Sequence, residues 1–155
     1  MDRLIFIVII LMVITPAFAG DNSTQEQINR GFDYIQSGKY QKAAEVFNTV
    51  ITEDRNNVDA YFGLGISYLK LGDNEAMTNS KVVQKAISAF NKALTLRANF
   101  PEVYYSLGLC YLALHDKETA IKMYETLKDL DIEIANKLLV RIDAYKQPEQ
   151  YMKIG

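Results

Sequence analysis

The chain has 155 residues, with 17 basic and 19 acidic side chains and a net charge of −2. This length predicts one domain that is large enough to bury a core of its own. Because acids and bases are interspersed without a basic stripe, we expect no nucleic-acid partner. A single cysteine excludes an internal disulfide.

The first 19 residues have the pattern of a secretion signal. A polar start is followed by an unbroken apolar run from Leu4 to Ile14, and Ala17 to Ala19 has the small-x-small pattern that signal peptidase cleaves. We therefore expect residues 1–19 to be a signal peptide and the mature chain to begin at Gly20. The alternative is an uncleaved membrane anchor, since the apolar stretch can be extended towards the cleavage point.

One short motif occurs three times along the chain. Its two full copies place an aromatic residue, Leu-Gly and tyrosine at the same spacing: Tyr61, Leu64, Gly65 and Tyr68, then Tyr104, Leu107, Gly108 and Tyr111. A weaker first copy has Gly31 and Tyr34, each 34 residues before its counterpart. Each copy is followed by an alanine and an aromatic four residues later: Ala43 and Phe47, Ala86 and Phe90, Ala120 and Tyr124. Such a period predicts stacked helical repeats.

The spacing within each copy predicts two helices joined by a tight turn. Residues at i, i+3, i+4 and i+7 share one helix face, so the motif marks the packing face of a first helix. Its glycine lets the second helix approach closely, and the aromatic residue of the second helix fills the space that the glycine leaves. Gly38 and Gly72 are expected where first helices end, because glycine is favoured just past a helix C-terminus.

The middle copy contains an insertion. The interval from Gly65 to Gly108 is 43 residues, which is nine more than the preceding interval, and the surplus falls at the turn Asp73–Lys81. Asn79 or Ser80 is expected to cap a second helix that starts early. The insertion is either a loop without a role or a second contact site.

Together these residues resemble the tetratricopeptide repeat (TPR), a helix-turn-helix unit of about 34 residues. The resemblance covers three units, 24–57, 58–100 and 101–134, and implies an all-α right-handed solenoid of three helix pairs. Residues 135–146 repeat the spacing of a first helix and are expected to form a C-terminal capping helix. Residues 147–155 are expected to be a flexible tail.

The resemblance also implies a groove lined by the first helices. The expected partner-binding residues are Phe32, Ile35, Phe62, Ile66, Leu69, Lys70, Tyr105, Leu109 and Leu112. This groove is largely apolar, unlike that of the carboxylate-clamp members, which use lysine and asparagine at positions held here by Ile28 and Phe32. A partner helix or an apolar peptide is therefore the expected ligand. The alternatives are a groove filled by the chain's own tail or by a second copy, and a set of residues that only build the core.

No motif for catalysis, phosphate binding or zinc binding occurs in the sequence. The single histidine, His115, is expected at a surface turn, and Cys110 is expected to be buried on an apolar helix face rather than reactive. We therefore expect no enzyme activity, cofactor, metal or small-molecule substrate. The predicted function is that of a protein-binding adaptor in an exported compartment, with a bacterial periplasm favoured over secretion or membrane anchoring.

Overall fold

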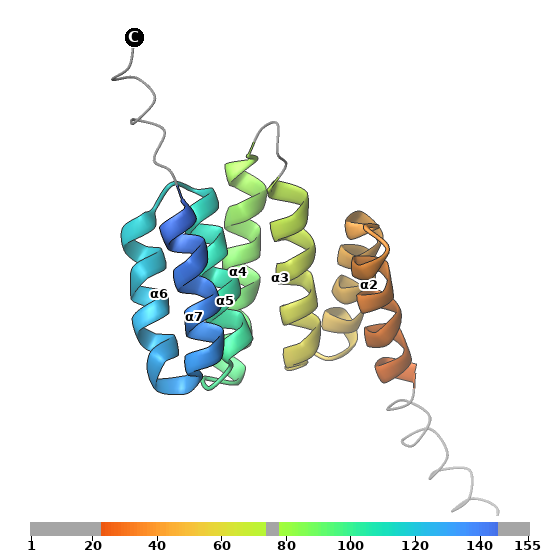
Figure 1. Ribbon diagram of the computed structural model, residues 1–155. Helices are drawn as coiled ribbons and strands as arrows, with labels where there is room; N and C mark the ends of the chain where they lie inside the picture. The colour runs from red at the N-terminus through yellow and green to blue at the C-terminus, as the bar shows by residue number, and fades with distance from the viewer. Residues whose placement is uncertain (1–22, 74–77, 146–155) are drawn as a thin grey trace, which may run out of the picture.

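A computed structural model describes residues 23–73 and 78–145 of the chain. All regular structure within these ranges is α-helical, and the helices stack as the predicted α-solenoid, in chain order up to α6, with α7 lying against both α5 and α6 (Figure 1). The predicted signal peptide and tail lie outside the described residues, as does part of the insertion. The helices are an N-terminal helix (residues 23–36), α2 (Tyr40–Glu53), α3 (Val58–Gly72), α4 (Ser80–Leu96), α5 (Pro101–Ala113), α6 (Lys117–Leu130) and α7 (Ile132–Ala144).

The helices fall into two sets. The first helices of the units are the N-terminal helix, α3 and α5, and α7 continues this set; we call the side that they form the first-helix face. The second helices, α2, α4 and α6, form the second-helix face. Helix α3 packs on both α2 and α4, and α5 packs on α4, α6 and α7, whereas the backbones of the second helices do not approach one another closely. The first helices therefore join the units together.

The turns confirm the predicted hairpins. Gly38 has a φ of 69° and His115 has a φ of 63°, so both adopt the left-handed conformation that ends a first helix. In each turn the backbone N–H donates to the carbonyl oxygen three residues earlier: Gly38 to Ile35, and His115 to Leu112. Gly72 instead is the last residue of α3 and has no positive φ. Helix α4 begins early as expected, because the Asn79 side chain accepts a hydrogen bond from the Val82 N–H.

The repeat glycines leave room for large side chains from neighbouring helices. A Cβ atom added to Gly31 would lie 2.6 Å from Phe47, and one added to Gly65 would lie 2.4 Å from Phe90. Both rings are fully buried, as the motif predicted. In the third unit the prediction was wrong, because Leu138 of α7 occupies the space beside Gly108 and Tyr124 is only half-buried.

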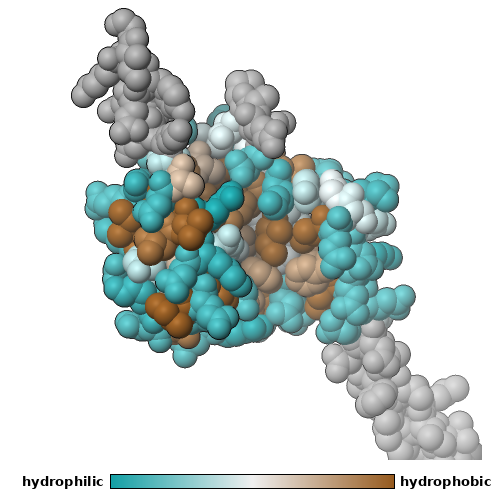
Figure 2. All heavy atoms as spheres, viewed as in Figure 1, coloured by the Kyte–Doolittle hydropathy of each residue, from teal (hydrophilic) through white to brown (hydrophobic). Residues whose placement is uncertain are grey.

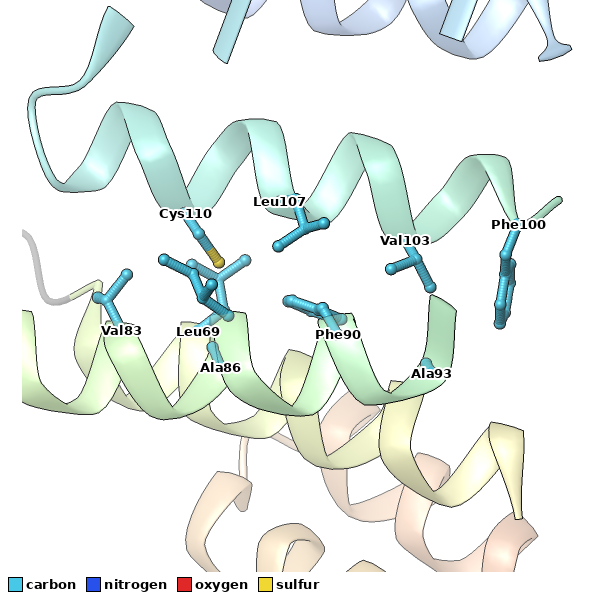
Figure 3. Close-up of a cluster of buried hydrophobic side chains, with 10 residues drawn as sticks. Leu69, Val83, Ala86, Phe90, Ala93, Phe100, Val103, Leu107 and Cys110 are labelled. Carbon is cyan, nitrogen blue, oxygen red and sulfur yellow. The ribbon is translucent and has the colours of Figure 1, made fainter. Parts of the chain in front are cut away.

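The central core cluster joins α3, α4 and α5. Cys110, Leu107 and Val103 of α5 point towards Phe90 and other side chains of α4 (Figure 3). Cys110 is fully buried, which confirms the sequence prediction. Burial raises the pKa of its thiol to about 12, with a smaller contribution from the charge of Asp73. This cysteine therefore behaves as a small apolar side chain.

The capping helix starts earlier than the predicted range of 135–146. Helix α7 spans Ile132–Ala144, and α6 ends at Leu130. The side chain of Asp131 accepts hydrogen bonds from the N–H groups of Glu133 and Ile134, both at 2.9 Å. This N-cap fixes the start of α7 directly after the end of α6.

Candidate functional site

The predicted partner-binding residues separate into three groups by exposure. Leu69 and Leu112 are buried members of core clusters, so they offer little surface to a partner. Lys70 is exposed near the C-terminal end of α3. The six others are half-buried on the first helices: Phe32, Ile35, Phe62, Ile66, Tyr105 and Leu109. These six side chains each combine a packed side with an accessible side.

Phe62 connects the candidate site to the core. Its ring centroid lies 4.9 Å from that of Phe100, 6.2 Å from that of Phe90 and 6.4 Å from that of Phe32. Phe32 in turn meets Phe47 edge to face, with centroids 5.1 Å apart. Tilted and edge-to-face arrangements are the favourable ones for aromatic rings. The accessible aromatic side chains of the site are therefore held in place by contacts between rings.

A cavity of about 290 Å³ opens on the first-helix face next to Phe62. It is lined by residues from α3, α5 and α7: Phe62, Glu102, Tyr105, Ser106, Ile134 and Lys137. Its interior is mainly apolar, while one carboxylate and one lysine lie among its lining residues. The sequence prediction omitted Ile134 and Lys137, although α7 repeats first-helix spacing and so continues the same face. Figure 2 shows apolar surface around α3, bordered by hydrophilic side chains.

A second cavity, of about 420 Å³, lies where α5 and α7 end. Leu109 and Ala113 of α5 line it together with Arg141, in the last turn of α7, and Tyr145, which directly follows α7. The hydroxyl of Tyr145 is hydrogen-bonded to Nδ1 of His115, so the turn after α5 is tied to the end of α7. This cavity is more polar than the first, and His115 is exposed there as expected.

The described residues offer contact surfaces rather than reactive groups. No three side chains of histidine, cysteine, aspartate or glutamate in this part of the chain cluster closely enough to hold a metal ion. Hydrogen bonds from Thr119 hold the pKa of Asp116 below its usual value, but this carboxylate is the N-cap of α6. None of the helices described is both long enough and apolar enough to cross a membrane.

Comparison with known families agrees with this geometry. The family model described as a TPR repeat matches residues 31–72, and the one described as a tetratricopeptide repeat matches residues 101–131. The chain contains tetratricopeptide repeats. The two matches cover most of the first unit, all of α3 and most of the third unit. No curated protein compared with the chain matches it.

Solved structures share the fold of these repeats. PcrH in complex with the chaperone binding region of PopD has a TM-score of 0.69 at 18% identity, over 81% of this chain and 92% of that one. The second TPR domain of human RPAP3, in complex with an HSP70 peptide, has a TM-score of 0.64 at 21% identity, over 76% of this chain and 92% of that one. A chain from the crystal structure of a T3SS complex from Aeromonas hydrophila has a TM-score of 0.69 at 16% identity, over 99% of this chain and 100% of that one. These likenesses establish the TPR fold.

Proposed function

We propose that this chain is a non-catalytic protein-interaction module that binds a helix or an apolar peptide of a partner on its first-helix face. The observation that carries the proposal is the cavity of about 290 Å³ between Phe62, Tyr105 and Ile134. Concave apolar sites with a few polar groups at the edge are the usual form of a binding site. Three packed helices supply the lining, so little ordering is required when a partner binds.

The chemistry of this site favours apolar over acidic ligands. Ile28 is buried at 5% exposure and Phe32 is half-buried, so the face lacks the cationic side chains that hold a terminal carboxylate at those positions. The RPAP3 and PcrH structures each contain a bound peptide or chaperone-binding region. They support the binding of a polypeptide segment as a general property of this fold. The apolar residues of this chain's own first-helix face determine which kind of segment it prefers.

The test is affinity capture from the native host with the parent chain and a Phe62→Glu/Tyr105→Glu variant. Two new carboxylates in the apolar cavity should abolish capture of a partner that binds there. A matched control, Thr49→Glu/Thr126→Glu, places the same charges on exposed positions of α2 and α6. Because Phe62 also packs on Phe100, Tyr105→Glu alone is tested as well, and circular dichroism verifies that each variant is folded. Equal capture by all variants would rule out the first-helix face.

Self-association is a second candidate function, favoured by the surface of the last two helices. Among the described residues, the exposed large apolar side chains are Ile121 on α6 and Ile132 and Val140 on α7, at 42%, 56% and 66% exposure. Figure 2 shows apolar patches over these helices. A contiguous exposed apolar surface often marks an interface. If a copy binds there, sedimentation will show a mass that rises with concentration, and Ile132→Lys/Val140→Lys will keep the chain monomeric.

Export of the protein is a further part of the proposal, supported by the sequence of residues 1–19 alone. Cleavage after Ala19 would place the repeats outside the cytoplasm, and a bacterial periplasm is the compartment that we propose. Intact mass and cell fractionation of the protein from its host test this directly. A mature chain that begins at Gly20 supports export with cleavage, whereas a full-length chain in the membrane fraction indicates an uncleaved anchor.

A further inference from the structure

The second-helix face carries a cavity that the proposed binding face does not use. Its volume is about 410 Å³, and α3 and α4 line it. Leu64 and Ala89, at 7% and 6% exposure, form its apolar floor. Tyr61 and Tyr68 of α3 lie beside them. Both floor residues are buried members of a core cluster that includes Ala44 and Phe47 of α2, so the accessible wall of the cavity is formed by the two tyrosines and by α4.

The edge of this cavity is positively charged. Lys81 and Lys85 of α4 line it, and Lys92 lies two turns further along the same helix. Helix α4 contains no acidic residue, although the whole chain has a net charge of −2. Among the described residues none of these three lysines forms an ion pair, whereas Lys122 and Lys128 of α6 are each paired with a glutamate.

Two of these lysines lie over the tyrosine rings. The Nζ atom of Lys85 is 5.6 Å from the ring centre of Tyr68, and that of Lys92 is 6.0 Å from the ring centre of Tyr61. An ammonium group within about 6 Å of a ring face is attracted to it. These contacts orient the lysine side chains, and no carboxylate within residues 23–73 and 78–145 pairs with them, so their charge is available to an acidic ligand.

The other two units lack this combination of an apolar cavity and lysines that have no acidic neighbour. In the first unit Lys42 corresponds to Lys85, but a cavity of about 310 Å³ there also contains the carboxylate of Glu45. In the third unit Glu118 corresponds to Gln84 and pairs with Lys122. The insertion also contributes a lysine to this cavity. Measured from the repeat alanine of each unit, α4 starts three residues earlier than α2 and α6 do. The extra turn contains Lys81.

We propose that this cavity is a second docking site, for an acidic segment of a protein partner. An apolar side chain of the segment enters between Tyr61 and Tyr68, and flanking carboxylates pair with Lys81 and Lys85. The concave shape and the apolar floor suit an inserted side chain better than a flat anionic membrane surface. Because none of the residues that line this cavity lines the cavity beside Phe62, the chain can hold two partners at once.

The experiment uses the full chain and the fluorescein-labelled peptide Glu-Asp-Leu-Phe-Asp-Glu. Fluorescence anisotropy measures its affinity, and the lysine analogue Lys-Lys-Leu-Phe-Lys-Lys tests the role of charge. We expect saturable binding of the acidic peptide only, weakening as salt is added. Lys81→Glu/Lys85→Glu should weaken binding by about tenfold or more, since two attractive contacts become repulsive. Ser88→Trp should block the cavity without changing its charge.

The matched control for Lys85→Glu alone is Lys42→Glu, which reverses one charge at the equivalent position of the first unit. This variant should bind the peptide as the parent does, and so should Tyr105→Glu on the first-helix face. Equal loss with Lys42→Glu would indicate nonspecific charge attraction and overturn the proposal. So would binding of vesicles of equal phosphatidylglycerol and phosphatidylcholine without binding of the peptide. Loss with Tyr105→Glu would assign the peptide to the other face and leave the proposed function standing alone.

Discussion

The packing beside Gly65 gives the sharpest stability prediction. Gly65 lies inside α3, where replacing glycine with alanine ordinarily stabilises a helix by about 1 kcal/mol. Here the new Cβ atom would lie 2.4 Å from Cε1 and 2.5 Å from Cδ1 of Phe90. The ring is fully buried between α3, α4 and α5, so it has no free space to move into. We therefore expect Gly65→Ala to destabilise the fold.

The expected magnitude follows from two opposing effects. Inserting a methyl group into a well-packed core costs about 1–3 kcal/mol, and the gain in helix propensity offsets about 1 kcal/mol of it. The net loss in free energy of unfolding should therefore be about 1 kcal/mol, reaching about 2 kcal/mol if the helices cannot separate. Gly65→Leu adds three more carbon atoms at the same position and should unfold the domain.

Urea unfolding followed by circular dichroism measures these changes, and a double-mutant cycle with Phe90→Leu isolates the contact. The smaller side chain gives the new methyl group space, so Gly65→Ala/Phe90→Leu should lose less stability than the sum of the two single variants. If Gly65→Ala is more stable than the parent by about 1 kcal/mol, helix propensity alone decides the outcome and the packing argument is refuted. Strict additivity of the cycle would refute it as well.

Three further predictions concern burial, capping and backbone strain. The Cys110 thiol should resist thiol reagents until the chain unfolds. Its pKa is about 12 in the folded chain and 9.0 without burial. Between these two pH values the folded chain therefore keeps a proton that the unfolded chain loses. This group should accordingly lower stability as pH rises from 9.0 to about 12 and contribute nothing below 9.0, and Cys110→Ala should remove this part of the pH dependence. Asn57→Ala should cost about 1 kcal/mol in urea unfolding, because its side chain caps α3 by accepting from the Ala60 N–H; an unchanged midpoint would contradict this. His115→Gly should raise the thermal midpoint of unfolding by relieving about 1 kcal/mol of backbone strain at the positive φ of this position. Gly38→Ala should lower the midpoint, because alanine is strained at the positive φ of Gly38. A lower midpoint for His115→Gly would show that the contact with Tyr145 outweighs the strain.

The fold was predictable because the repeat places small and large residues at fixed offsets. The spacing from Gly65 to Ala86 and Phe90 identifies the two helix faces that meet, and the structure brings these residues together. The tight turns were predictable for a similar local reason, since Gly38 supplies a backbone conformation that other residues adopt at a cost. His115 adopts it too, so the third turn follows from its place in the repeat rather than from its residue type.

The last unit was predicted less accurately because its neighbours differ. No further helix pair is described after α7, and Leu138 instead of Tyr124 packs against Gly108. The start of α7 depends on Asp131, whose capping role can be recognised only when the end of α6 is known.

The candidate site shows the same limit. Periodicity placed Leu69 and Leu112 on the correct helices, but their burial depends on side chains from other helices. The cavity beside Tyr61 and Tyr68 was not predicted, because it depends on the separation of α3 and α4 in space. Offsets along one helix contain no information about that separation.

The most direct test of the proposed function is site-specific photo-crosslinking in the native host. A benzophenone side chain is introduced at Tyr105, in the cavity of the first-helix face, and separately at Thr126, which is exposed on α6. We predict that illumination attaches a partner protein to the variant at position 105 and not to the variant at position 126. Crosslinking at position 126 without any at position 105, with both variants folded, would contradict binding on the first-helix face.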